Sequence, residues 1–270
     1  MLNNGINPPD EIIFDGKVHR FKNDKGKDSC WYVAHNDGIP CATFGDWKTG
    51  QKINCAESNQ AKFTETERSD RLIKQLQRMR QRKLDEDVKN NNAISAATWI
   101  WGKSLPVNHH AYLVKKKINP HSARLYNGSL VIPIWSKNTL VSLQFIDASG
   151  KKIFLKDGKL KGSYAQVGKF NPNQPAVIAE GWATCVSLHE KFGYPTYVAL
   201  SASNLRHVAQ YVRSIHTTNQ VIICGDNDPV GRKSAQEAAD LIGASCLIPP
   251  TEGFDWNDQI NYENEIGAGL

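Results

Sequence analysis

The chain has 270 residues, of which 40% are hydrophobic and 22% are charged, and both shares are ordinary for a globular protein. At roughly 150 residues per domain, this length predicts one or two domains. No stretch approaches the ~20 consecutive apolar residues of a membrane-spanning helix, and the N-terminus lacks the apolar core of a secretory signal. The sequence therefore argues against a protein that spans or binds a membrane and against a secreted one.

The six cysteines are scattered and never form a Cys-x-x-Cys pair. This distribution predicts reduced thiols in a cytoplasmic protein, and it argues against a disulfide framework or a zinc ribbon. An irregular zinc site built from His19, Cys30, His35, Cys41 and Cys55 is the alternative. Isolated cysteines and histidines more commonly pack in a core, so no zinc is expected.

The charges are distributed unevenly. Residues 115–169 carry 11 basic and 2 acidic side chains, whereas residues 170–270 carry 5 basic and 11 acidic ones. A basic stretch beside an acidic one suggests that the first holds a polyanion and that the second holds metal ions. The alternative is that the lysines form a solvated face. The aromatic residues of the basic stretch are predicted mainly to pack in a core, with base stacking as the alternative; they are Tyr126, Trp135, Phe145 and Tyr164.

In chain order, the first element is a small β-rich unit over residues 11–55, because short β-prone runs alternate with turns that contain Asn, Asp and Gly. Residues 64–89 place apolar side chains among alternating charges, which predicts a long and mostly exposed helix. A second helix is predicted over residues 93–104. A second β region follows over residues 124–158, where alternating apolar and polar residues are joined by Asn-Gly, Ser-Gly and Asp-Gly turns.

From residue 176 onward, short apolar strands alternate with helices, and this alternation predicts a parallel α/β sheet with right-handed connections. Gly193 is predicted to end the first of these helices and Asn204 to begin the second. The predicted fold class is therefore α/β, or α+β overall. Its four parts are a small β-rich N-terminal unit, a helical segment, a basic β-rich subdomain and a parallel α/β domain, over residues 1–60, 61–120, 121–170 and 171–270.

Three carboxylates lie at the ends of predicted parallel strands: Glu180 after the first, and Asp226 and Asp228 after the third. Functional groups gather beyond the carboxyl ends of such strands, and residues two apart point to the same side. Clustered carboxylates repel one another unless a divalent cation binds them, and magnesium prefers oxygen ligands. The alternative interpretation of Asp-Asn-Asp-Pro is a turn that caps the next helix.

Residues 176–260 resemble a TOPRIM domain, the metal-binding module of bacterial primases, type I and II topoisomerases and some nucleases. The resemblance rests on Glu180 in VIAEGWAT and on Asp226 and Asp228 in IICGDNDPVGRKSA. It implies that these three residues are catalytic and bind Mg²⁺ or Mn²⁺, and that the chemistry concerns nucleic-acid phosphates. Asp255 and Asp258, in GFDWNDQI, resemble the acidic tail that follows this domain in many phage and plasmid primases, and are weaker candidates.

Residues 127–168 resemble the segment that precedes TOPRIM in TraC-like primases of conjugative plasmids and satellite phages. More loosely, they resemble the basic half of the polymerase domain in DnaG-type primases. This resemblance implies that lysines beside the carboxylates bind nucleotide and DNA phosphates, and Lys152 and Lys161 are the best matches. Further candidates for phosphate contacts are Arg124, Lys156, Arg232 and Lys233.

The resemblance implies a DNA primase that makes short RNA primers on single-stranded DNA from ribonucleoside triphosphates, for replication of a mobile element. Glu180 is then either a metal ligand or a general base. No P-loop motif occurs in the sequence, so a replicative helicase is expected from a separate protein or from a missing C-terminal region. The alternatives are a TOPRIM nuclease and a non-catalytic DNA-binding replication module.

Overall fold

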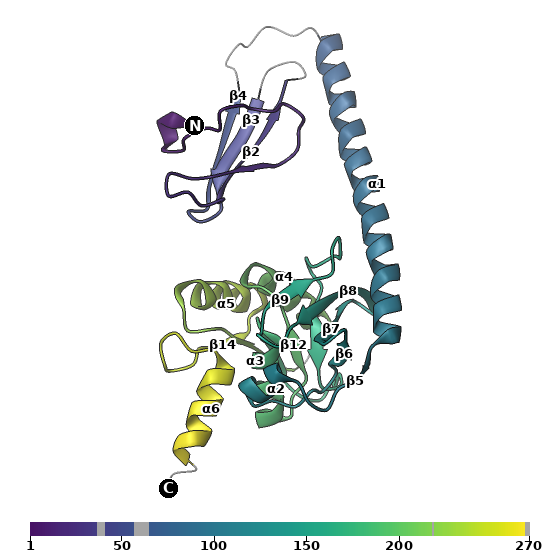
Figure 1. Ribbon diagram of the computed structural model, residues 1–270, viewed down its shortest axis with the longest axis vertical. Helices are drawn as coiled ribbons and strands as arrows, with labels where there is room; N and C mark the ends of the chain where they lie inside the picture. Colours follow the sequence, from purple (N-terminus) through teal and green to yellow (C-terminus); the bar gives the residue numbers. More distant parts are fainter. Residues whose placement is uncertain (37–40, 57–64, 218, 268–270) are drawn as a thin grey trace. The chain divides into compact units, whose positions relative to one another are not determined.

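The structure is a computed structural model that describes residues 1–36, 41–56, 65–217 and 219–267 (Figure 1). The chain divides into two compact units, Met1–Arg78 and Met79–Leu270. Residues 39, 40 and 64, at the ends of a predicted strand and a predicted helix, lie outside the described residues. Within the described part of the chain, none of the helices combines the length and the apolar character needed to cross a membrane.

The first unit contains an antiparallel sheet, here called the N-terminal sheet, after a 3-10 turn at Leu2–Asn4. Alternate residues of its second strand are buried, so that one face covers a small core around Tyr32 and Phe44. The predicted β-rich unit is therefore confirmed. In order, its strands are β1 (His19–Phe21), β2 (Cys30–His35), β3 (Cys41–Asp46) and β4 (Gln51–Ala56).

Helix α1 (Glu65–Lys103) is continuous, so the prediction of two separate helices over 64–89 and 93–104 is wrong. The predicted break falls on residues 90–92, which are three asparagines. Asparagine disfavours a helix far less than glycine or proline does, and strong helix formers flank the run. Side chains from residue 72 to residue 89 are exposed, as predicted.

The second unit contains an antiparallel sheet, here called the middle sheet. Helix α2 (Ala111–Lys116), within the predicted helical segment, lies between its first two strands in the chain. Tyr164 is buried, and Tyr126, Trp135 and Phe145 pack against apolar clusters, which confirms that these aromatics serve the core. In order, the strands are β5 (Leu105–Pro106), β6 (Arg124–Tyr126), β7 (Ser129–Ser136), β8 (Thr139–Ile146) and β9 (Lys152–Phe154).

The second unit also contains the predicted parallel sheet, which we call the mixed sheet because one antiparallel strand is added at its edge. Its spatial order is β10-β12-β11-β13-β14, and only β10 runs antiparallel to its neighbour. The strands are β10 (Ala165–Val167), β11 (Ala176–Ala179), β12 (Thr196–Val198), β13 (Val221–Cys224) and β14 (Ser245–Leu247).

Helices cover both faces of the mixed sheet. Val177 and Ala179 of β11 share one apolar cluster with α3 (Trp182–Phe192) and with Ile260 of α6 (Trp256–Gly267). Ala176 and Ile178 share the opposite cluster with α4 (Leu205–Ile215), which follows a 3-10 turn at Ala202–Asn204, and with α5 (Pro229–Ile242). Burial of both faces explains why these strands are continuously apolar. The sequence does not predict α6, whereas Gly193 ends α3 with a φ of 73°, as predicted.

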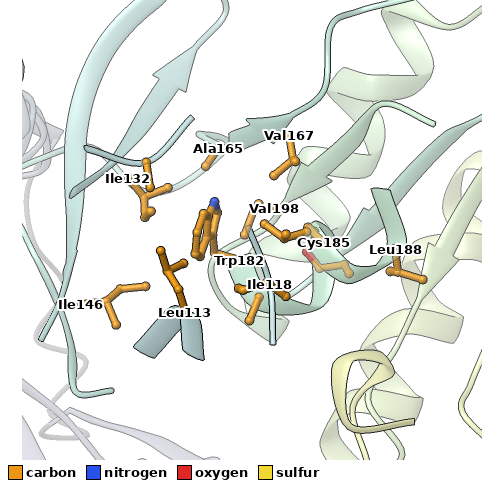
Figure 2. Close-up of a cluster of buried hydrophobic side chains, with 14 of the residues drawn as sticks. Leu113, Ile118, Ile132, Ile146, Ala165, Val167, Trp182, Cys185, Leu188 and Val198 are labelled. Atoms are coloured by element: carbon orange, nitrogen blue, oxygen red, sulfur yellow. Dashed lines mark hydrogen bonds between the residues drawn. The ribbon is translucent and has the colours of Figure 1, made fainter. Parts of the chain in front are cut away.

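The larger core joins the middle sheet to the mixed sheet (Figure 2). Trp182, which is 1% exposed, lies among Leu113 of α2, Ile132 of β7 and Val198 of β12. Because this core packs densely, it holds the two sheets in one arrangement. Strand β9 and helix α2 are thereby fixed relative to the carboxyl edge of the mixed sheet.

Candidate active site

The predicted carboxylates lie at the carboxyl edge of the mixed sheet. Strands β11 and β13 are adjacent and parallel, with Ala179 opposite Cys224. Glu180 follows β11 directly, and Asp226 lies two residues beyond the end of β13. The topology therefore brings Glu180 and Asp226 to neighbouring positions, although they are 46 positions apart in the sequence.

Asp226 occupies the most perturbed position at this edge. Burial raises its pKa to about 7, and the charges of Asp255, Glu180 and Asp228 add to this effect, whereas Lys152 opposes it. The Oδ1 atom of Asp226 is buried and has no hydrogen-bond partner. Leaving a buried carboxylate oxygen without a partner is unfavourable, so the site favours a bound cation or a proton at this atom.

Glu180 and Asp228 complete the predicted trio. Burial raises the pKa of Glu180, with a further contribution from Asp228, and Lys152 acts in the opposite direction. Asp228 is also the N-cap of α5, because its Oδ1 accepts a hydrogen bond from the backbone N–H of Gly231 at 2.7 Å. The capping interpretation of the Asp-Asn-Asp-Pro sequence is therefore confirmed for Asp228, which also acts electrostatically on Glu180, while its role as a metal ligand stays a prediction.

Two lysines stand beside these acids. Partial desolvation lowers the pKa of Lys152, at the start of β9, and Lys116 contributes to this, whereas Asp255, Glu180 and Asp226 raise it. The Nζ of Lys116 lies 3.7 Å from Oδ2 of Asp255. Lys152 is a predicted residue, but Lys116 is not.

The predicted acidic tail is the start of helix α6. Oδ1 of Asp255 accepts a hydrogen bond from the backbone N–H of Asp258 at 2.9 Å, and Asp258 in turn lies 3.0 Å from Nζ of Lys116. Asn257 donates hydrogen bonds to the carbonyl oxygen of Lys116 and to Oγ of Ser187, both at 2.7 Å. These contacts join α6 to α2 and α3. We call Glu180, Asp226, Asp228 and Asp255 the carboxylate cluster.

Lys161 lies in a second basic region, on the loop between β9 and β10. It lines a cavity of about 660 Å³ together with Lys89, Lys159 and His207. Partial burial lowers the pKa of His207, and the positive charges of Lys161 and Arg206 lower it further. Glu86 and Asp157 also line this cavity, so its three lysines leave it a small net positive charge.

Asn204 holds the loop that carries Lys161. It stands at the N-cap position of α4, as predicted, but its side chain makes no capping hydrogen bond. Its Oδ1 instead accepts a hydrogen bond from the N–H of Gly162 at 2.8 Å. Its Nδ2 lies 3.1, 2.9 and 2.8 Å from the carbonyl oxygens of Leu160, Ser163 and Ala199. Asn204 is thus a cross-link between the basic loop and the mixed sheet.

The other predicted basic residues make local contacts. The guanidinium of Arg124 lies 4.1 Å from the centroid of the Trp101 ring and donates to the Trp101 carbonyl oxygen at 2.9 Å. Arg232 donates to Oδ1 of Asn227 at 2.6 Å and so braces the turn between Asp226 and Asp228. Lys233 pairs with Glu237 at 3.9 Å, and Lys156 is exposed.

A divalent cation fits the chemistry of the carboxylate cluster. Within the described residues, no three Asp, Glu, His or Cys side chains converge closely enough to hold a metal ion as they stand. The buried Oδ1 of Asp226 nevertheless lacks a partner, and the surrounding donors are carboxylates. Such oxygen donors suit magnesium and manganese.

The residues of the alternative zinc site divide between the two faces of the N-terminal sheet. Cys30 lies in the small core, whereas His35 and Cys41 stand opposite each other at alternate positions of the register, on the other face. His19 stacks on Tyr32 on the core side, with ring centroids 5.1 Å apart. The fold therefore separates these side chains.

Residues 175–264 match the family model of the Toprim domain. Over 260 residues the chain is 27% identical to a DNA primase TraC of Escherichia coli, covering 89% of this chain and 18% of that protein. A second DNA primase TraC of Escherichia coli is 28% identical over 258 residues, covering 88% of this chain and 24% of that protein. The chain thus spans about a fifth to a quarter of the length of these curated relatives.

Among solved structures, the primase fragment of the bacteriophage T7 primase-helicase protein is 20% identical to this chain. Its TM-score is 0.49, and the match covers 62% of this chain and 76% of that one. The family match begins one residue before β11 and ends within α6, so it contains the whole carboxylate cluster. Over residues 175–264 this chain is thus similar to the Toprim domain.

Proposed function

We propose that this chain synthesises short RNA primers on single-stranded DNA by nucleotidyl transfer, in the replication of a mobile element. The proposal is carried by the buried, unpartnered Oδ1 of Asp226, within a carboxylate cluster that has Lys152 beside it. The similarity to DNA primase TraC over most of the chain supports primer synthesis over other reactions of Toprim domains.

Asp226, Asp228 and Glu180 would hold Mg²⁺ or Mn²⁺, because carboxylate oxygens are ligands that these ions prefer. When bound, the ions supply positive charge that stabilises the transferring phosphoryl group. Ligation by Asp226 would also satisfy the oxygen that burial leaves without a partner.

The side chains around the cluster position the reactants. Lys152 pairs with a phosphate of the incoming ribonucleoside triphosphate, since it is a cation beside the cluster on which Glu180, Asp226 and Asp255 all act. Glu180 either ligates the cation or accepts the proton of the attacking 3′-hydroxyl group, a role that suits a carboxylate with a raised pKa. Lys161 and its basic cavity bind template phosphates without reading sequence.

A replicative helicase, in a separate protein or in another region of a longer one, completes this proposal as the partner that exposes the template. The relatives are several times longer than this chain, which leaves room in them for such a region. A cytoplasmic location stays a prediction from the sequence.

A primer-synthesis assay tests the proposal directly. The protein is incubated with single-stranded DNA, labelled ribonucleoside triphosphates and Mg²⁺ or Mn²⁺, and we expect short labelled products. Asp226→Asn should lower synthesis at least about 10²-fold, since a charge that acts on the transition state is lost. This variant is preferable to changes at Asp228, which also caps α5. Asp240→Asn, at an exposed carboxylate of the same helix, is the matched control and should retain synthesis.

Each other outcome has a distinct meaning. Metal-dependent cleavage of the DNA without nucleotides would identify a nuclease instead. Salt-sensitive DNA binding with neither synthesis nor cleavage would identify a non-catalytic module. Synthesis that is equal in Asp226→Asn and Asp240→Asn would place the chemistry outside the carboxylate cluster.

A further inference from the structure

The N-terminal sheet has a second face that its small core does not use. Arg20 of β1, Trp31 of β2, Gly45 of β3 and Lys52 of β4 stand opposite one another in a row that crosses all four strands. Trp47 follows β3 and stacks on Trp31, with ring centroids 5.8 Å apart and an interplanar angle of 25°. We call Arg20, Trp31, Trp47 and Lys52 the tryptophan face.

The tryptophan face is an ordered arrangement. A Cβ atom on Gly45 would collide with the backbone carbonyl oxygen of Gln51 and would lie 3.2 Å from Nε1 of Trp31, so the glycine allows both β4 and the Trp31 ring to approach β3 closely. The guanidinium of Arg20 lies 4.6 Å from the centroid of the Trp47 ring. Trp47 nevertheless remains 49% exposed. A large aromatic ring is thus held in place by stacking while half of its surface stays open to a ligand.

The charge of the tryptophan face is positive. Arg20 and Lys52 are exposed. None of the described register positions on this side of the sheet carries a carboxylate; the others are Val33, His35, Cys41, Thr43 and Asn54. Asp46, the acidic residue within these strands, pairs with Cys30 and Gln51 and so lies on the opposite side. The face therefore combines open aromatic surface with cations, and lacks negative charge.

We propose that the tryptophan face binds single-stranded nucleic acid, with a base stacked on Trp47 and with phosphates paired to Arg20 and Lys52. The bases of a single strand expose their π-faces, and every base can stack on an indole ring. The bases of a duplex are already stacked on one another, so the face discriminates against double strands. The inference concerns a site outside the Toprim domain and needs neither metal nor nucleotide, so it goes beyond the proposed primase activity.

Binding of a short fluorescein-labelled oligothymidylate to the full chain, followed by fluorescence polarisation in EDTA without nucleotides, tests this inference. Trp47→Ala should weaken binding about 5- to 100-fold, the range that loss of one stacked base produces. Trp47→Phe should restore most of the affinity. Trp99→Ala, at a tryptophan of α1 that is 59% exposed, is the matched control and should leave the affinity unchanged. An oligouridylate measured in parallel distinguishes DNA from RNA as the preferred ligand.

Because the second unit has basic surfaces of its own, a second measurement locates the contact. An oligonucleotide that carries 5-iododeoxyuridine should photo-crosslink to Trp31 or Trp47, as mapped by mass spectrometry. Crosslinks confined to residues 79–267, with equal affinity of Trp47→Ala and Trp99→Ala, would overturn the inference and leave the face to a protein partner. Asp226→Asn should bind the oligonucleotide normally while losing synthesis, so the two proposals fail separately.

Discussion

The mixed sheet and the N-terminal sheet use their surfaces in opposite ways. Helices cover both faces of the mixed sheet, and its polar groups gather beyond the strand ends, where Glu180 and Asp226 lie. The N-terminal sheet gives one face to a small core and presents Trp47 and two cations on the other. A sheet that is covered on both faces can offer a ligand only the groups at its strand ends. A sheet that is covered on one face can bind a ligand on its other face.

The largest expected effect contrasts Trp182 of α3, in the core that covers the mixed sheet, with Trp47, on the open face of the N-terminal sheet. Trp182 is 1% exposed and Trp47 is 49% exposed. Trp182→Ala should therefore lower the free energy of unfolding of the second unit by about 3–5 kcal/mol, because a large cavity forms. Trp47→Ala should lower the free energy of unfolding of the first unit by about 1 kcal/mol or less. Urea unfolding monitored by circular dichroism measures both, and equal losses would contradict the contrast between covered and open faces.

A smaller effect is expected at Asn204, which ties the basic loop to the carboxyl edge of the mixed sheet. Asn204→Ala leaves buried backbone groups without a partner and should lower the free energy of unfolding by about 2–3 kcal/mol. Gln210→Ala, on the exposed side of the same helix, should change it by less than about 0.5 kcal/mol. If the two variants unfold at the same urea concentration, the edge is not held by this side chain.

The smallest effect concerns pH and the charge held at the edge. The pKa of Asp226 rises from its ordinary value of 3.8 to about 7 in the folded protein. The folded state then binds a proton more tightly than the unfolded state, so this contribution to stability is complete below about pH 4 and is lost as the pH rises through about 7.

In EDTA, we expect the free energy of unfolding of the unmodified protein to fall by about 1–2 kcal/mol more than that of Asp226→Asn between about pH 6 and about pH 8. If the free energies of unfolding of the two proteins change with pH in the same way, ionisation of Asp226 does not destabilise the folded state. Addition of Mg²⁺ should reduce the difference, because a cation compensates the ionised carboxylate.

The parallel strands and the predicted carboxylates were accessible to sequence reasoning because both leave local signals. A strand buried on two faces, such as β11, is continuously apolar, and a carboxylate directly after it marks the strand end. Gly193 likewise ends α3 with the positive φ that glycine adopts easily.

The remaining features depend on contacts between distant residues. Lys116 contacts Asp258, which is 142 positions away in the sequence, and only the folded core brings the two side chains together. Helix α6 was missed because its sequence is mostly polar; Asp255 before Trp256, with an acid three residues later, is the N-cap signal that could have found it. The spacing of Trp31 and Trp47 becomes meaningful only once the register places Trp31 opposite Gly45, two residues before Trp47.

If a descendant of this protein lost its activity, the two aspartates of the Asp-x-Asp pair would be retained to different degrees. Asp228 begins helix α5 through a hydrogen bond to Gly231, and its replacement by alanine would cost about 1 kcal/mol whatever the protein does. Asp226 places an unpartnered oxygen in the interior and makes folding less favourable. In a descendant that had stopped doing chemistry, Asp228 would therefore be retained for folding, while Asp226 would be free to drift. The residue to inspect when sorting active from inactive relatives is Asp226.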